Sequence, residues 1–145
     1  MFSNQIAAAA AAVPLLITGQ PVVEFAQNAG PYANWVFLYE DSFEDRSGRE
    51  ITQAWWLSPD TTHESNVVNF RLLARRSPIS DNGTAAAVFD YVADCETKAY
   101  TIERTEFLDV NDQTLDVQMI QRVMEPSDPE SPFHDVLEDL CGGIR

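Results

Sequence analysis

Apolar residues recur at every second position along most of this chain, and at helical spacing only near its C-terminus. The clearest alternation lies in residues 86–95, and it is typical of a β-strand with two distinct faces. One face would carry Phe89, Tyr91, Ala93 and Cys95, and the other Val88, Asp90, Val92 and Asp94. We take this strand as the reference for the rest of the chain.

The helical pattern spans residues 133–141, where apolar residues fall at positions i, i+3, i+4, i+7 and i+8 and form one stripe. The stripe consists of Phe133, Val136, Leu137, Leu140 and Cys141. Two starts are open, because Asp128 before Pro129 and Ser131 before Pro132 each combine an N-cap with proline at the first helical position. Gly142 is placed to end the helix.

Five other segments alternate in the manner of strands: residues 35–40, 51–57, 67–74, 100–107 and 117–124. Turn signals separate them, notably at residues 45–48 and 81–84, whereas the polar residues 60–66 and the acidic residues 109–116 are expected to be loops. Glu125-Pro126 is expected to stop the last strand. Six strands followed by one helix predict an α+β fold, an antiparallel sheet with the C-terminal helix packed on one face.

Cys95 and Cys141 are the only cysteines, so a single intramolecular bridge is available. Each lies in phase with apolar neighbours, one on the reference strand and one on the helix. The pattern therefore favours a disulfide that ties the helix to the sheet. The alternative is two reduced, buried thiols.

The first 29 residues differ from the rest and are interpreted as a leader, with residues 30–145 forming one domain. The apolar run at residues 6–17 is shorter than the roughly 20 residues that span a bilayer, and small residues follow it. This is the outline of a secretory signal peptide, although no basic residue precedes Arg46. The alternatives are a retained alanine-rich helix and a disordered tail. A cleaved signal would place the protein in the periplasm, at the cell surface or outside the cell.

The charge is strongly acidic, with 23 acidic against 9 basic residues and a formal net charge of −14. Nucleic acids and anionic membrane surfaces are bound through basic surfaces. The composition therefore argues against both as partners.

Two histidines are the candidates for acid–base chemistry. His134 falls on the polar face of the predicted helix, beside Asp135 and Glu138, and His63 lies in a loop next to Glu64. A histidine–carboxylate pair can transfer protons, but we expect both histidines to be solvated surface residues. Because no serine or cysteine stands in a recognisable nucleophile motif, we do not expect an enzyme.

The acidic loop resembles a calcium-binding loop only superficially. It lacks glycine at the sixth position, where Thr114 stands, and its twelfth position is Ile120 instead of glutamate. It remains a weak candidate for a cation site, and no metal or organic cofactor is expected. The candidate ligands are Asp109, Asn111, Asp112 and Asp116.

A possible interaction surface is indicated by Trp55 and Trp56, together with Arg75 and Arg76. One of two consecutive tryptophans on a strand must point away from the core that the other joins, and exposed aromatic residues are enriched at interfaces. The alternative is a sheet that packs apolar side chains on both faces.

Several of these features, in the same order, resemble the surface-adhesin protein E family, small secreted domains of Gram-negative bacteria. The residues that carry the resemblance are Trp35, Trp55-Trp56, Phe89-Asp90-Tyr91, Asp94-Cys95, Tyr100, Glu125-Pro126-Ser127 and Leu140-Cys141-Gly142. The resemblance implies an antiparallel sheet with a disulfide-fastened helix, in the periplasm or at the cell surface, and adhesin-like binding of host proteins.

Together these observations predict an exported, non-enzymatic interaction or structural domain with an unknown protein partner. One alternative is a binder of a small apolar ligand on the concave face of the sheet. The other is an acid–base enzyme that uses His63 or His134.

The leader interpretation predicts that the mature protein begins between Gln20 and Gly30, behind the apolar run. Intact-mass spectrometry of the protein recovered from the cell envelope measures this directly. Envelope protein that still carries Met1 would contradict the prediction.

Overall fold

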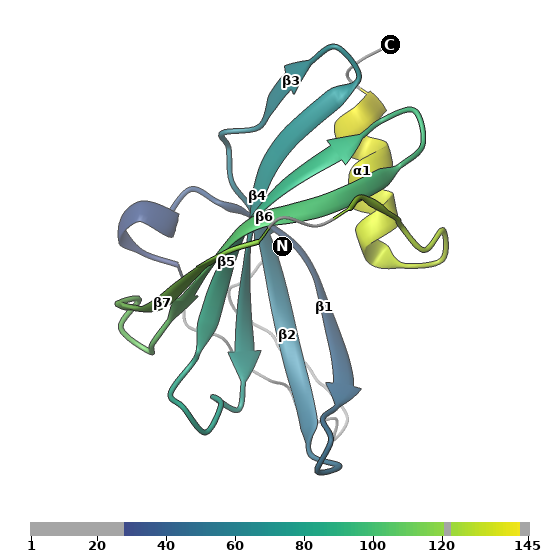
Figure 1. The fold of residues 1–145 in the computed structure, drawn as a ribbon. Helices are drawn as coiled ribbons and strands as arrows, with labels where there is room; N and C mark the ends of the chain where they lie inside the picture. The colour runs from purple at the N-terminus through teal and green to yellow at the C-terminus, as the bar shows by residue number, and fades with distance from the viewer. Residues whose placement is uncertain (1–27, 121–122, 143–145) are drawn as a thin grey trace, which may run out of the picture.

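The computed structural model of the protein describes residues 28–120 and 123–142, and within them one antiparallel sheet is followed by one α-helix (Figure 1). The elements in chain order are the 3-10 helix η1 (Gly30–Tyr32), the strands β1 (Val36–Glu44), β2 (Glu50–Leu57), β3 (Thr62–Glu64), β4 (Val67–Ser77), β5 (Ala86–Asp94), β6 (Ala99–Leu108), β7 (Thr114–Met119) and β8 (Glu125–Pro126), and the helix α1 (Pro132–Cys141).

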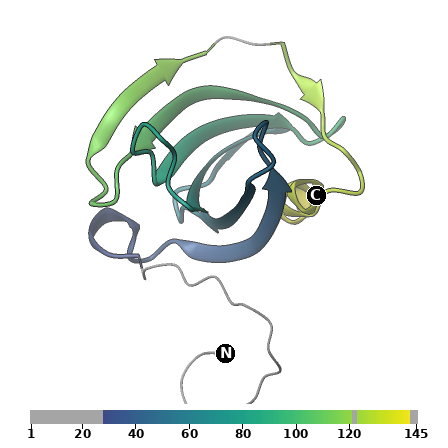
Figure 2. The same ribbon diagram turned by 90° about the horizontal axis from the view of Figure 1, so that it is seen from below.

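The six longer strands pair in the order β1-β2-β4-β5-β6-β7, and every pairing is antiparallel. The short β3 pairs with β4, while β7 and β8 pair with opposite ends of β6. The sheet curls into a half-barrel, with η1 and α1 on opposite sides of the curl (Figure 2). The predicted fold class, an antiparallel sheet of about six strands with one C-terminal helix, is confirmed.

Alternate residues of the central strands form two apolar clusters, one on each face of the sheet. The helix-side cluster comprises the buried residues Val68, Phe70, Leu72, Tyr91, Ala93, Leu137 and Cys141, with Phe89 and Cys95 packed against it. The opposite cluster comprises Leu73, Ala86, Val88 and Leu108, covered by Tyr32, Trp35 and Trp56. The two faces of the reference strand are therefore divided as the alternation predicted.

The helix begins at the second of the two predicted starts. Ser131 is its N-cap and accepts a hydrogen bond from the backbone N–H of His134 at 3.2 Å, and Pro132 occupies the first helical position. Gly142 follows as the C-cap, as predicted. The helix buries Val136 and Leu137 against the sheet.

Both ends of α1 are fastened to the sheet. At the first turn, the Phe133 ring lies 4.7 Å from the Tyr100 ring and 5.1 Å from the Tyr91 ring, measured between centroids. At the last turn, Cys141 forms a disulfide with Cys95, and their Cα atoms are 5.4 Å apart. The predicted bridge is confirmed, and the alternative of two free thiols is excluded.

The turns between strands are organised by side chains that bond to the backbone. Asp45 Oδ1 accepts hydrogen bonds from Ser47 Oγ at 2.6 Å, Ser47 N at 2.9 Å and Arg49 N at 3.0 Å. The bond from Ser47 Oγ is the main cause that lowers the pKa of Asp45 to about 2. Gly48 adopts a φ of 84° in this turn, a conformation that glycine takes most readily.

Three segments differ from the sequence prediction. Residues 60–66, expected to be a loop, contain β3, whose exposed polar residues show no apolar alternation. The last long strand covers residues 114–119 instead of 117–124, and Glu125-Pro126, expected to stop it, forms β8 against Tyr100 and Ala99.

The predicted leader lies almost wholly outside the described residues, which begin at Asn28. In the part of the chain that is described, no helix has the length and apolar character needed to cross a membrane.

We expect Cys141→Ser to lower the free energy of unfolding by roughly 2–5 kcal/mol, the usual effect of removing a native disulfide from a small domain. Cys95→Ser should have the same effect, and the double variant should lose little more, because one bond is lost in all three. Denaturant unfolding of the three variants measures these differences. Losses that add in the double variant would contradict a single shared bond.

Candidate functional site

Trp55 and Trp56 point to opposite faces of β2, and each joins one of the two apolar clusters. Trp55 Nε1 donates a hydrogen bond to Asp41 Oδ1 at 3.3 Å. The Trp56 ring packs edge-on against Phe37, with the ring centroids 5.6 Å apart. The sheet thus packs aromatic residues on both faces, which was the alternative to a tryptophan-based interaction surface.

Trp55 belongs to a row of aromatic side chains that crosses the helix-side face. It stacks between Tyr39, at 6.0 Å, and Phe89, at 5.8 Å, and the row continues through Tyr91 to Phe133 in the first turn of α1. Burial, followed by the nearby Asp41 carboxylate, raises the pKa of Tyr39 to about 12, and burial likewise raises the pKa of Tyr91. Both tyrosines therefore stay neutral at physiological pH, as core residues do.

Arg75 and Arg76 also point to opposite faces, so they do not form a joint basic patch. Arg75 is only 11% exposed and makes two hydrogen bonds to the carboxylate of Asp112, at 2.9 and 3.1 Å, and a third to Asn28 Oδ1 at 2.8 Å. Arg76 donates from Nε to the Pro78 carbonyl at 2.9 Å. Arg75 is thus a structural residue, and only Arg76 remains available as a binding residue.

The carboxylates of the acidic loop are already engaged within the fold. Asp109 Oδ1 accepts hydrogen bonds from the backbone N–H groups of Asn111, at 2.8 Å, and Gln113, at 3.0 Å, while Asp112 holds Arg75. Asp116 lies on β7, opposite Phe107 of β6. Within residues 28–120 and 123–142, no three histidine, cysteine, aspartate or glutamate side chains are placed to hold a metal ion.

The two histidines lie at opposite ends of α1. His63, on β3, makes a hydrogen bond from Nε2 to the carbonyl of Leu140 in the last turn, at 2.9 Å. His134, in the first turn, lies 2.6 Å from Ser127 Oγ through Nδ1 and 3.3 Å from Glu138 Oε1 through Nε2. Six helical residues advance by about 9 Å, so the two rings do not share one catalytic site.

Contrary to its expected place on a solvated surface, His134 is only 14% exposed, because the segment that carries the buried Ser127 packs over the first turn of α1. The contact between Ser127 and His134 superficially resembles that between the nucleophile and the general base of a serine hydrolase. However, Ser127 Oγ donates its proton to the carbonyl of Lys98 at 2.8 Å and so accepts a hydrogen bond from His134. A histidine that donates to serine cannot act as its base. The arrangement ties α1 to the end of β6.

The grooves among the described residues include three open ones. One, of about 220 Å³, lies beside the disulfide between Lys98 and Glu138, and another, of about 200 Å³, lies between Asp60 and Glu103. The largest of these three, of about 480 Å³, runs between the β4–β5 loop and β7. Each has charged or polar side chains on its rim, so none resembles an enclosed apolar cavity.

The most exposed apolar surface of the described residues lies on β7, at one edge of the sheet, and at residues 123–124, just before β8. Five of the ten exposed large apolar side chains of the described residues lie there, which makes this edge the main apolar feature of the surface: Leu115, Val117, Met119, Val123 and Met124. The sequence prediction placed Val117, Met119 and Val123 on one strand face, but it gave no sign that this strand lies at an edge.

The opposite edge strand, β1, is better protected against strand pairing. It carries three acidic residues, Glu40, Asp41 and Glu44, whereas Asp116 is the only charged residue of β7. Charged side chains on an edge strand discourage the pairing of other chains. The β7 edge is thus the less protected of the two.

Comparison of the chain with protein-family models, with curated proteins and with solved structures gives no match. The resemblance to the surface-adhesin protein E family therefore stays an expectation from the sequence.

We expect Ser127→Ala to lower the free energy of unfolding by about 1–3 kcal/mol, because it removes two hydrogen bonds of a buried hydroxyl, one to the Lys98 carbonyl and one from His134 Nδ1. Thr62→Ala, which removes an exposed hydroxyl from β3, is the matched control and should change little. A fluorophosphonate probe for activated serines should leave Ser127 unlabelled. Covalent labelling at Ser127 would contradict its structural role.

Proposed function

We propose that this protein is an exported, non-enzymatic protein-binding domain, and that its partner attaches along the β7 edge. The observation that carries the proposal is the exposed apolar row on that edge, where Val117 is 40% and Met119 is 73% exposed. Strand alternation places these two side chains on the same face, and exposed apolar surface that gathers in one place is typical of an interaction site.

The backbone of β7 supports the same proposal. The strand pairs with β6 on one side, and its outer side has no backbone partner among the described residues. An extended segment of a partner can add to such an edge, with main-chain hydrogen bonds for affinity and side-chain contacts for specificity. Val117 and Met119 would meet the side chains of the added strand on one face.

Export is supported by the disulfide, since such bonds persist in oxidising compartments and are rare where thiols are kept reduced. The leader expected from the sequence also supports export. The proposed location is the periplasm or the cell surface.

The net charge of the chain indicates which kind of partner it can bind. At a formal net charge of −14, two copies of the chain repel each other, whereas a basic protein surface is attracted. We therefore expect a protein partner with a basic surface around an extended, partly apolar segment. Adhesin-like attachment to a basic host protein is one form that such an interaction can take.

The acid–base alternative is less favoured, because His63 and His134 lie at opposite ends of α1 and each is engaged with a structural partner.

A photocrosslinking amino acid at position 119, in cells of the source organism, tests the proposal. The same amino acid at position 36, which is 58% exposed on the opposite edge strand, is the matched control. We expect one defined protein to be crosslinked from position 119 and not from position 36. No crosslinked protein from position 119, or the same products from both positions, would contradict the proposal.

The purified partner then provides the quantitative test. Met119→Ser removes an apolar contact without changing the charge, and it should weaken binding by about tenfold, the scale of one contributing interface residue. Val36→Ser should leave the affinity unchanged, and added salt should weaken binding to the unaltered protein.

A further inference from the structure

We propose that the groove between the β4–β5 loop and β7 is a binding site for a neutral saccharide unit. Its volume is about 480 Å³, and it is lined by Arg76, Ser80, Asp81, Asn82, Thr84, Phe107, Leu115, Asp116 and Gln118. Sites for small molecules generally have volumes of roughly 300–1,000 Å³. The groove shares β7, and Leu115 itself, with the proposed protein-binding edge, but its polar side chains on β7, Asp116 and Gln118, lie on the other face of the strand from Val117. Substitutions on the two faces therefore test the two proposals separately.

The groove lies on the sheet face that α1 covers, but at the other end of the strands. Strand alternation places Phe107, Asp116 and Gln118 on this face, whereas Val117 points to the opposite one. In Figure 1, α1 covers one end of β4 and β5, and the loop that connects them lies at the far end. No described helix covers the groove.

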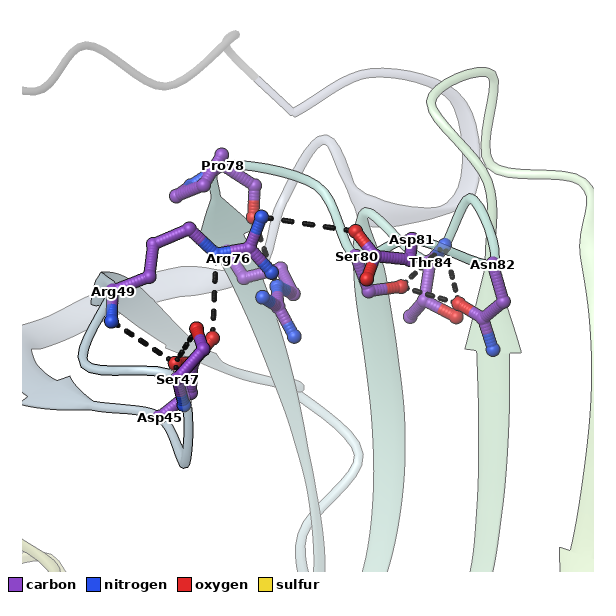
Figure 3. A network of polar contacts seen from close by, with 9 residues as sticks. All are labelled: Asp45, Ser47, Arg49, Arg76, Pro78, Ser80, Asp81, Asn82 and Thr84. Atoms are coloured by element: carbon purple, nitrogen blue, oxygen red, sulfur yellow. Dashed lines mark hydrogen bonds and ion pairs between the residues drawn. The ribbon is translucent and has the colours of Figure 1, made fainter.

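The loop side of the groove is held in place by its own hydrogen bonds (Figure 3). The backbone N–H of Thr84 donates to Ser80 Oγ at 3.0 Å and to Asn82 Oδ1 at 3.1 Å, and Ser80 Oγ donates to Asn82 Oδ1. Arg49, from the β1–β2 turn, lies 3.7 Å from Asp81, which is directed towards that turn. The wall is therefore formed before a ligand arrives.

The remaining polar groups of the groove have no partner among the described residues. They include donors on Arg76 and Asn82, an acceptor on Asp116, and groups that both donate and accept on Thr84 and Gln118. These groups surround an apolar floor made by Phe107 and by Leu115, which is 46% exposed. Such a site fits a ligand with one apolar face and a rim of groups that both donate and accept hydrogen bonds.

A saccharide ring has this construction, because its C–H groups form an apolar face and each of its hydroxyls donates and accepts. Charge favours a neutral sugar. An anionic ligand would be repelled by Asp116 and by a chain of net charge −14, and a cationic ligand would meet the guanidinium of Arg76.

The test is titration of the full-length, isotopically labelled protein with maltotriose, cellotriose and chitotriose, each to about 10 mM, a concentration at which millimolar binding is measurable. Amide shifts in the NMR spectrum locate the site. We expect at least one of these sugars to shift amides of residues 76–84 and 115–118, and lysine or inorganic phosphate to leave those amides unchanged.

Two variants on the same strand separate the groove from the rest of β7. Asp116→Ala with Gln118→Ala removes polar groups from the groove and should weaken sugar binding by about tenfold. Val117→Ala with Thr114→Ala alters the other face of β7 and should leave sugar binding unchanged. The absence of shifts for all three sugars, shifts elsewhere on the protein, or equal effects of the two variants would overturn the proposal.

Discussion

The attachment of α1 to the sheet is the interaction on which the rest of this structure depends. A helix of ten residues is marginal in water without tertiary contacts. Here Leu137 is fully buried, Phe133 packs on aromatic residues of the sheet, and Cys141 is bonded to Cys95. Fully burying one leucine side chain contributes about 1.5–3 kcal/mol, so packing and the covalent bond are of comparable size.

The attachment of α1 also explains why one end of the sheet is closed and the other is open. Around α1, His63 holds β3, Ser127 holds the start of β6 and the end of β8, and the disulfide holds the end of β5. That end of the sheet is therefore closed. The other end has no α-helix among the described residues. The groove beside the β4–β5 loop and the apolar β7 edge both lie away from α1, and both proposed binding functions use this open part of the sheet.

Much of this fold is predictable from the sequence, because its strongest patterns reflect burial. The faces of residues 86–95, the apolar stripe of the helix and the in-phase cysteines all follow from side chains that must leave water. β3 and β8 were missed because their residues are exposed and are held by pairing with a neighbouring strand, which leaves no apolar pattern.

The candidate site was harder to predict, because it depends on which residues meet across the sheet. Arg75 and Arg76 were predicted to belong to one interaction surface, yet alternation sends Arg75 inward to Asp112, 37 positions away in the sequence. His134 was expected on a polar helix face, but the segment around Ser127 covers it. Nothing in residues 114–119 indicates that this strand would lie at an edge with its outer side unpaired.

Hydrogen exchange of the protein before and after selective reduction of Cys95–Cys141 tests the central claim most directly. If the disulfide and the packing of α1 together close this end of the sheet, reduction should increase exchange in residues 132–141, 62–64 and 125–127, while β4 and β5 keep their protection. Unchanged protection of α1 after reduction, or an equal loss of protection throughout the sheet, would contradict the account.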